Sequence, residues 1–443
     1  MNKYQENLFS NLFAWLQIWT TVVRLGVVQM AIGSMAVLPT TTFNTVMVTE
    51  LGLLQLVPGI LIAIQYFVQI TRPNWGFRSD IGGNRTLWIM IGLFILGMGL
   101  TLACLGIYFF PMYFYLGLTV SIIGYILIGL GVSAAGTTLL TLIATSVRDD
   151  RKGAAATITW TMMILGIVLT AGFVGEHIID PYSIKKLFFI VLSLSFIWPL
   201  ICGLSVYKIE KKTTPDNFSS AKDDTIKVSF THGLKQVLSE KNTRRFFVFV
   251  FLSMMAFFMQ EPILEPYSVL AFDFTIGEST DLTSEQNKGV LLGMLLVGVA
   301  TSVLRIGSLK FWAMFGCVGS GLALLLIAFF GQVDASKMTL IFCVYFFGLN
   351  TGIFVIGAIG SMMKLANLGT EKRVGTRMGV FGVGQAIASG VAVIFSSLLV
   401  DIIQTILNDP AVSYGLVLSL EAILFLAAAV LAVKLLTEDK EFN

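Results

Sequence analysis

The sequence predicts an all-α membrane protein whose twelve transmembrane helices form two pseudo-symmetric six-helix bundles. Its 443 residues are 56% hydrophobic and only 12% charged, whereas soluble globular proteins carry about 25% charged residues. Many apolar stretches reach the roughly 20 residues that a helix needs to cross a hydrocarbon core. One long polar segment, residues 208–244, divides the chain nearly in half. These three observations define the predicted architecture.

Helices are favoured over a β-barrel because the apolar runs are far longer than barrel strands and do not alternate strictly. The predicted spans of the first half are residues 22–48, 52–70, 86–110, 112–146, 153–178 and 184–207. Those of the second half are residues 245–272, 287–307, 309–331, 337–365, 375–403 and 412–435. The predicted units are therefore an N-terminal half (1–207), a central loop (208–244) and a C-terminal half (245–443).

The orientation follows from the basic residues, because cytoplasmic loops carry an excess of Lys and Arg. With the N-terminus in the cytoplasm, 25 of the 29 basic residues fall on the cytoplasmic side. The four exceptions are Lys185, Lys186, Lys288 and Lys337. Both termini and the central loop are therefore predicted to be cytoplasmic.

Composition and missing motifs exclude several classes of function. The net charge is only +3 and the basic residues are dispersed, so we expect no nucleic-acid partner. Each of the four cysteines lies singly in an apolar run, which favours reduced, packed thiols over disulfides or a metal site. We find no P-loop, nucleophile elbow, zinc-protease helix or dinucleotide fingerprint. The chain is therefore predicted not to be an enzyme and not to hydrolyse ATP.

Two local patterns refine the expected arrangement. Residues 7–19 place apolar side chains on one helical face, which favours a short interfacial helix over an extension of the first span. The fifth and eleventh spans are both rich in glycine and end near an acid, Asp180 and Asp401 respectively. Small residues allow close helix packing, so we expect both spans near the interface between the halves.

The loop after the second span contains "GFRSDIGGNR", which resembles the loop pattern G-x-x-x-D-x-x-G-x-[RK] of the major facilitator superfamily. The matching positions are Gly76, Asp80, Gly83 and Arg85, whereas Ile81 and Asn84 depart from the usual basic residues. The resemblance implies the major facilitator fold. It also implies that Asp80 latches against the start of the eleventh helix and holds the cytoplasmic gate shut. Arg78 completes the predicted gate motif.

A narrower resemblance covers most of the chain. Separated motifs in span one, in residues 43–52 at its end, in the gate loop and in span seven look like the PucC, or bacteriochlorophyll-delivery, family of the superfamily. The residues that carry this resemblance are Arg24, Leu25, Gln29, Gly33, Asn44, Met47, Glu50, Gly52, Gly76, Phe77, Arg78, Asp80, Gln260, Glu265, Pro266 and Tyr267. Members of that family are associated with light-harvesting complex assembly and with the supply of (bacterio)chlorophyll.

The segment "MQEPILEPY" is the strongest candidate for a binding site, because ionisable groups inside a membrane are costly and usually functional. Glu261 and Glu265 lie four residues apart, as on one helical face. Pro262 and Pro266 weaken the helix by removing backbone donors, so we expect a broken helix. Such a site could bind the magnesium of a chlorophyll, directly or through water, or couple to protons. The alternatives are a far-side surface position or pairing with Arg or Tyr groups.

Asn44, Gln260 and Tyr267 join the two acids in the predicted substrate-binding set. The predicted supporting residues are Arg24, Gln29, Glu50 and Gln385. A single polar residue in a span is more often a helix-to-helix hydrogen bond, and Arg24 could instead extend to the membrane surface.

The resemblance implies a membrane carrier or assembly factor that handles chlorophyll-type pigment for light-harvesting or photosystem complexes. No covalent cofactor is expected, but bound chlorophyll or bacteriochlorophyll is. Expected partners are membrane lipid and either a light-harvesting or photosystem apoprotein or a pigment-synthesis enzyme. The expected location is a bacterial cytoplasmic, intracytoplasmic or thylakoid membrane. Two alternatives stay open, namely a proton-coupled transporter of a small solute or drug and a non-transporting assembly scaffold.

Overall fold

The computed structural model describes residues 2–72, 74–75, 84–146, 152–209, 241–302, 304–333, 335–367 and 374–438, and every regular element in these ranges is helical. The first half comprises α1 (Asn2–Thr40), α2 (Thr42–Thr45), the π-helical turn η1 (Val46–Glu50), α3 (Leu56–Val68), η2 (Gln69–Thr71), α5 (Arg85–Phe109), α6 (Phe114–Ser146), α7 (Lys152–Val174), η4 (Gly175–Ile179) and α8 (Ile184–Val206). The second half comprises α10 (Lys241–Met259), α11 (Leu264–Phe272), α12 (Ile276–Ser302), α13 (Leu309–Phe330), α14 (Lys337–Asn367), α15 (Val374–Leu407) and α16 (Pro410–Glu438).

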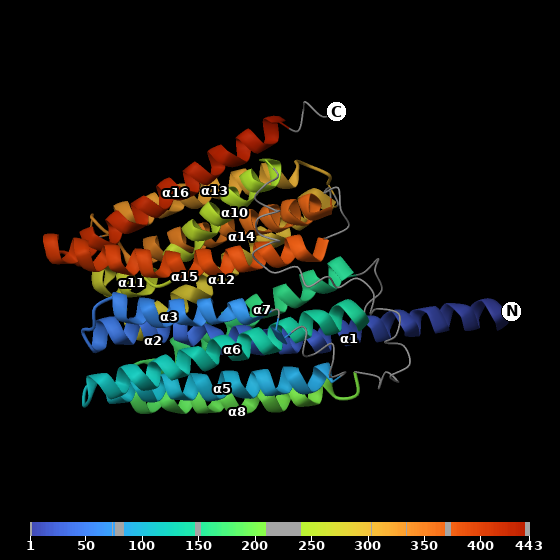
Figure 1. Cartoon of the computed structure of the whole chain (residues 1–443), viewed down its shortest axis with the longest axis horizontal. Helices are drawn as coiled ribbons and strands as arrows, with labels where there is room; N and C mark the ends of the chain where they lie inside the picture. The colour runs from blue at the N-terminus through green and yellow to red at the C-terminus, as the bar shows by residue number, and fades with distance from the viewer. Residues whose placement is uncertain are drawn as a thin grey trace.

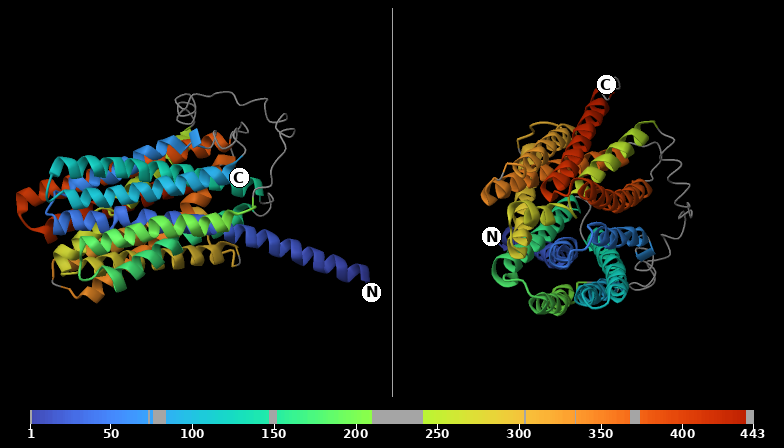
Figure 2. Two further views of the ribbon diagram at one scale, coloured as in Figure 1. Left: turned by 90° about the horizontal axis from the view of Figure 1, so that it is seen from below. Right: turned by 90° about the vertical axis from the view of Figure 1, so that its left-hand side faces the viewer.

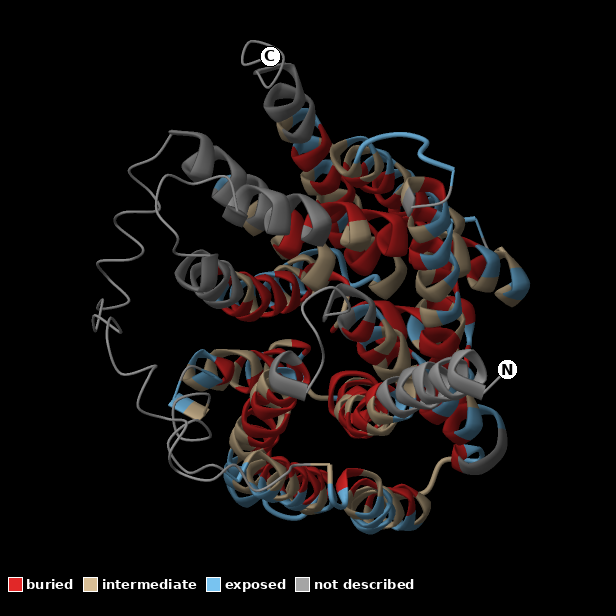
Figure 3. Cartoon of the chain, turned by 90° about the vertical axis from the view of Figure 1, so that its right-hand side faces the viewer, coloured by how far each residue is buried: buried red, intermediate tan, exposed pale blue. Residues whose placement is uncertain are grey.

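Within the described ranges, nine helices are long and apolar enough to cross a membrane, so the chain is an integral, multi-pass membrane protein. The other three predicted spans are occupied by the short helix α3, by the broken pair α10 and α11, and by the polar-starting α12. Large apolar side chains such as Phe189 and Leu204 of α8 are exposed, as expected of a lipid-facing helix. Figure 3 shows buried residues where helices face one another and exposed residues on the outer surfaces.

The helices form two bundles that lie side by side with nearly parallel axes (Figures 1 and 2). Among the residues that the structure describes, one apolar core is built from residues 22–206, with Ile276 and Val393 as its contributions from the second half. The other core is built entirely from residues 254–429. This is the division expected of two bundles. The exact boundary at residues 208–244 stays a prediction, because most of that loop lies outside the described residues.

The two bundles meet chiefly along two pairs of helices, α3 against α15 and α7 against α12. Close approach depends on glycine. A Cβ atom added to Gly175 would lie 2.6 Å from the carbonyl oxygen of Gly277. The glycine-rich fifth and eleventh spans, α7 and α15, therefore both lie at the interface, each against a helix of the other bundle.

Two predictions about helix boundaries were wrong. Residues 7–19 form no separate interfacial helix, because α1 is continuous from Asn2 to Thr40 and extends beyond the bundle (Figure 1). Residues 276–286, predicted to be part of the loop between the seventh and eighth spans, are helical as well, since α12 begins at Ile276. Hydropathy missed its first turns because they carry Glu278, Asp281 and Glu285.

Candidate functional site

The candidate site is a layer of buried and half-buried polar groups between the bundles, near the end opposite the start of α1. We call this end the distal end. The groups of this interface polar layer are Asn44, Thr45, Gln55, Tyr66, Glu261, Pro262, Glu265, Thr283, Asp401 and Tyr414.

An irregular stretch after α1 brings the first of these groups to the interface. Pro39 lies in the last turn of α1, and its carbonyl accepts a hydrogen bond from the buried Tyr125 hydroxyl at 2.7 Å. The chain turns at Thr41 and re-enters a helix for only one turn of α2, followed by π-helical η1. Asn44 and Thr45 are consequently fully buried and reach the second half.

The predicted break in the seventh span is present. α10 ends at Met259 and α11 begins at Leu264, with a turn between them. Pro262 has no amide to donate inside the turn. Pro266 lies in the first turn of α11, where amides have no intrahelical acceptor. Because the break separates Glu261 from Glu265, their four-residue spacing does not place them on one continuous helical face, and the two carboxyls contact different partners.

The carbonyl of Pro262 is not free. It accepts hydrogen bonds from the Asn44 amide at 2.6 Å and from the Gln55 amide at 2.7 Å. Gln55 also donates to Asn44 Oδ1 at 3.0 Å and accepts from the Tyr414 hydroxyl at 2.9 Å. Two amides of the first half therefore hold the broken helix and α16 of the second.

Glu265 is buried and Glu261 is half-buried, and both carboxyls are bonded to hydroxyl groups of the interface. The Tyr66 hydroxyl lies 2.7 and 2.5 Å from the two carboxyl oxygens of Glu261. Glu265 is 3% exposed and accepts from Thr45 at 3.1 Å and from Thr283. Neither carboxyl lies at the surface. The Tyr pairing considered for these acids holds for Glu261 and joins the two halves.

A third carboxyl completes the acidic set. Glu421 of α16 is fully buried, and no hydrogen bond reaches either of its oxygens. It lies next to the backbone of Gln260, at the break between α10 and α11. Burying an unpaired charge in a low-dielectric interior costs several kcal/mol or more. Glu421 is therefore the polar group of this region with the least internal compensation among those described.

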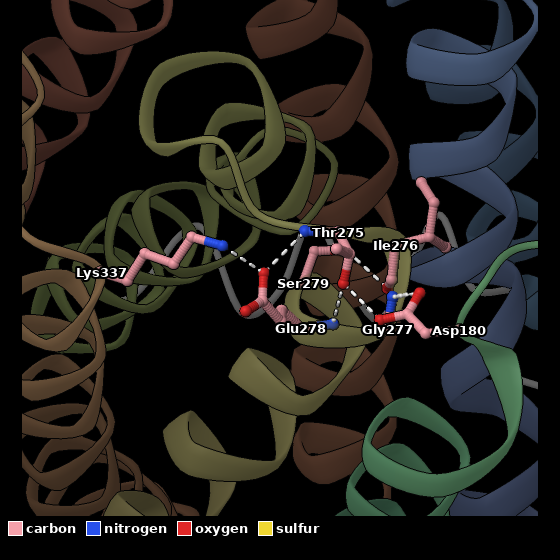
Figure 4. Close-up of polar contacts among 7 residues, drawn as sticks. All are labelled: Asp180, Thr275, Ile276, Gly277, Glu278, Ser279 and Lys337. Carbon is pink, nitrogen blue, oxygen red and sulfur yellow. Dashed lines mark hydrogen bonds and ion pairs between the residues drawn. The ribbon is translucent and has the colours of Figure 1, made fainter.

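Aspartates close the interface at the distal end. Asp401 of α15 accepts hydrogen bonds from the backbone amides of Gln55 and Leu56, which begin α3. Asp180, which follows η4, accepts from the Gly277 amide at 3.0 Å and from the Thr275 hydroxyl at the start of α12 (Figure 4). Each half thus supplies an acid to a helix start of the other half.

The other predicted site residues have different surroundings. Tyr267 is buried and stacks on Tyr414 with ring centroids 6.0 Å apart. Gln260 is 6% exposed and lies at the break. Arg24 donates to the carbonyls of Ser205 at 2.7 Å and Tyr207 at 2.5 Å, so it binds the end of α8. A cation at a helix C-terminus is stabilising, which gives Arg24 a structural role.

The other three supporting residues do not belong to the polar layer. Gln29 donates to Met163 Sδ at 3.1 Å. Glu50 is exposed at the end of η1, and Gln385 is half-buried in α15. In the gate motif, Arg85 begins α5. Positions 76, 78, 80 and 83 lie outside the described residues, so the predicted Asp80 latch stays a prediction.

Sequence reasoning missed Gln55, Tyr66, Thr45 and Glu421. Gln55, Tyr66 and Thr45 carry no sequence signal, because single polar residues are frequent at helix ends and interfaces. Glu421 did carry one, since it is the only acidic residue in the predicted span 412–435. An isolated acid within an apolar run indicates an interior position.

Two bundles joined by polar groups at their interface define the class of this protein as a major facilitator-type membrane protein. Solved structures with this fold cover nearly the whole chain. The nucleoside transporter NupG, solved as a mutant, matches 94% of this chain and 99% of its own, with a TM-score of 0.69 and 14% identity. A bacterial homologue of the human drug peptide transporters matches 96% of this chain with the same TM-score and 13% identity. These structures confirm the predicted fold class, although the count of twelve spans stays a prediction.

The sequence profile of the PUCC protein family matches residues 42–440, and the chain belongs to that family. It is 44% identical over 414 residues to the "Bacteriochlorophyll synthase 44.5 kDa chain" of Rhodobacter capsulatus, covering 94% of this chain and 95% of that protein. It is 27% identical to "Protein PucC" of Cereibacter sphaeroides, covering 93% and 91% of the two chains. The family predicted from the scattered motifs is thus confirmed.

Proposed function

We propose that this protein handles (bacterio)chlorophyll-type pigment in a photosynthetic membrane, as a carrier or assembly factor for light-harvesting or photosystem complexes. The observation that carries the proposal is the 44% identity, along nearly the full length of both chains, to a relative named for bacteriochlorophyll synthesis. Full-length similarity to proteins named PucC agrees with it.

The interface polar layer supports a carrier or assembly role over catalysis. Its buried groups come from both bundles, so any movement that separates the bundles exposes Glu261 and Glu265 together with the Pro262 carbonyl. Carboxylate and carbonyl oxygens suit a hard cation such as the magnesium of a chlorophyll. In the conformation described, hydroxyl and amide groups donate hydrogen bonds to these oxygens. Pigment binding at this layer would therefore require the bundles to separate and those hydrogen bonds to be exchanged.

A deletion strain tests the proposal and separates it from its rivals. Deleting the gene in its native photosynthetic host should abolish at least one antenna or photosystem complex while pigment is still synthesised. Loss of the pigment itself would instead indicate a biosynthetic enzyme. Unchanged pigment and unchanged complexes would favour a carrier of an unrelated small solute.

Purification provides the second test. The protein purified from the native membrane should carry pigment that is extracted with red and Soret absorption. Co-purification of an antenna apoprotein or a pigment-synthesis enzyme would identify the proposed partners. A colourless protein that restores antenna assembly would leave a scaffold role and exclude stable pigment binding.

A further inference from the structure

Two aspartates at the distal end bind the start of a helix in the opposite bundle. Asp401 lies near the end of α15, and its two oxygens accept from the amides of Gln55 and Leu56 at 2.9 and 2.8 Å. Asp180 follows the end of α7 and η4, and it accepts from the amide of Gly277 at 3.0 Å and from the Thr275 hydroxyl (Figure 4).

The two contacts are related by the internal repeat. Counted as membrane spans, α7 and α15 are the fifth of their halves. In the same count, α3 and α12 are the second of their halves. Each fifth span therefore carries an aspartate at or near its distal end, and this aspartate binds the start of the second span in the other half. Since both contacts join the same pair of bundles, a rigid rotation that opens the distal end has to break both.

The chemistry at each start explains why an acid is suited to it. The first amides of a helix have no intrahelical acceptor and form its positive end. α3 has no side-chain cap of its own, so Asp401 supplies the acceptors. At α12, Thr275 accepts from the Glu278 amide at 3.1 Å while Glu278 accepts from the Thr275 amide at 2.8 Å, a capping box. Asp180 accepts hydrogen bonds from the Thr275 hydroxyl of this box and from the Gly277 amide.

We propose that Asp180 and Asp401 form a paired latch that holds the distal end closed and sets the equilibrium between closed and open arrangements of the two bundles. In the closed state both acids are bonded across the interface. On opening, both acids and the start of α3 lose these partners and must be hydrated. The latch acts on the conformational equilibrium whatever the protein carries, so it is independent of the proposed pigment function.

Two buried serines serve as reporters when changed to cysteine. Ser397 is fully buried one turn before Asp401, its hydroxyl has no hydrogen-bond partner, and it lies against Gly59 of the other bundle. Ser284 is 1% exposed and lies in α12, the helix whose start binds Asp180. Its hydroxyl donates to the Val168 carbonyl across the interface at 3.1 Å. The measurement is the rate of maleimide labelling of purified full-length protein in nanodiscs. The parent chain, whose four cysteines are buried, gives the background.

Replacing Asp401 by alanine should raise the labelling rate at both reporters by about three- to thirtyfold, the range that loss of an N-cap produces. Asp401→Asn should give a smaller increase because asparagine retains one acceptor oxygen. Asp180→Ala should act in the same way, and the combined variant should approach the product of the two changes. The distant reporter is decisive, because a latch on a rigid-body motion exposes both interfaces at once.

Asp409 provides the matched control. It accepts from the Val412 amide at 3.1 Å and caps α16 within its own half, so Asp409→Ala should change neither rate.

A second control cross-links the two halves. Thr42 and Thr280 face each other across the interface with their hydroxyl oxygens 3.1 Å apart, and cysteines at both positions should form a disulfide that returns labelling of the Asp401→Ala protein to background.

Three results would overturn the proposal. An increase only at the reporter beside the substituted acid would indicate local fraying. Unchanged rates at both reporters would show that the acids do not bias the equilibrium. Faster labelling that persists in the cross-linked protein would indicate unfolding, which size-exclusion elution of each variant measures independently.

Discussion

Gln55 is predicted to be the residue whose loss most weakens the contact between the two bundles. Its side chain is 2% exposed and makes three hydrogen bonds, to Asn44, to the Pro262 carbonyl and from the Tyr414 hydroxyl. Gln55→Leu keeps a similar volume and removes all three. Pro262 retains its bond from Asn44, but Asn44 Oδ1 and the Tyr414 hydroxyl lose a partner.

The expected cost follows from these bonds. Side-chain hydrogen bonds between membrane helices contribute about 0.6 kcal/mol on average and up to about 1.7 kcal/mol. Three bonds therefore amount to about 2 kcal/mol. The cost rises to about 5 kcal/mol if no water replaces the lost partner of Asn44 Oδ1 and of the Tyr414 hydroxyl. Tyr414→Phe removes only one of the three and should cost about 0.6–1.7 kcal/mol.

A double-mutant cycle provides the assay. The free energies of unfolding of the parent, Gln55→Leu, Tyr414→Phe and the combined variant are measured by SDS titration in mixed micelles. Because both substitutions remove the same bond, the combined variant should be more stable than the sum of the single effects predicts, by about 0.6–1.7 kcal/mol. Strict additivity, or a cost below about 0.5 kcal/mol for Gln55→Leu, would refute the assignment of Gln55 as the central contact.

Further predictions concern charge and orientation. Glu265→Gln keeps the size and one acceptor oxygen but removes the charge, so the protein should express normally but lose most antenna assembly, whereas Glu261→Gln should be milder. Full activity of Glu265→Gln would rule out a charged role, and poor expression would indicate a structural one. At the distal surface, partial burial raises the pKa of Glu278, but the hydrogen bond and charge of Lys337, 2.6 Å away, outweigh it and lower this pKa. The pair should therefore add about 0.2–1 kcal/mol to stability at neutral pH, and this contribution should be lost as the pH falls below the ordinary carboxyl value of 4.5. Equal thermal midpoints for Glu278→Gln and the parent at pH 7 would contradict this prediction. A cysteine at Ser219 should react with impermeant maleimide only from the cytoplasmic side, and labelling from the opposite side would reverse the predicted orientation.

The fold was predictable because its determinants are local. Apolar length, the polar segment 208–244 and the glycine-rich spans each occupy a continuous stretch of sequence. Helix starts were harder. α12 begins with polar turns that a hydropathy argument assigns to a loop, although Thr275 and Glu278 have the spacing of a capping box.

The site was predictable only in part, because its partners are distant in sequence. The prolines of "MQEPILEPY" indicated the break, and Glu265 was singled out. Nothing local indicates that Thr45 reaches Glu265, 220 residues away, or that Gln55 reaches Tyr414, 359 residues away. Such pairings depend on how the two bundles dock, which a single sequence does not encode in any short pattern.

The same separation has a consequence for biogenesis. Asn44 and Gln55 enter the membrane early in synthesis, but their acceptor at Pro262 and the Tyr414 hydroxyl emerge from the ribosome hundreds of residues later. During that interval the first six helices contain two amides without their final partners, in a solvent that penalises unpaired polar groups. Water or a neighbouring protein must solvate those amides until the second bundle docks. The Tyr414 hydroxyl of α16 supplies the latest of these hydrogen bonds, so the interface can close fully only after α16 has been synthesised and inserted.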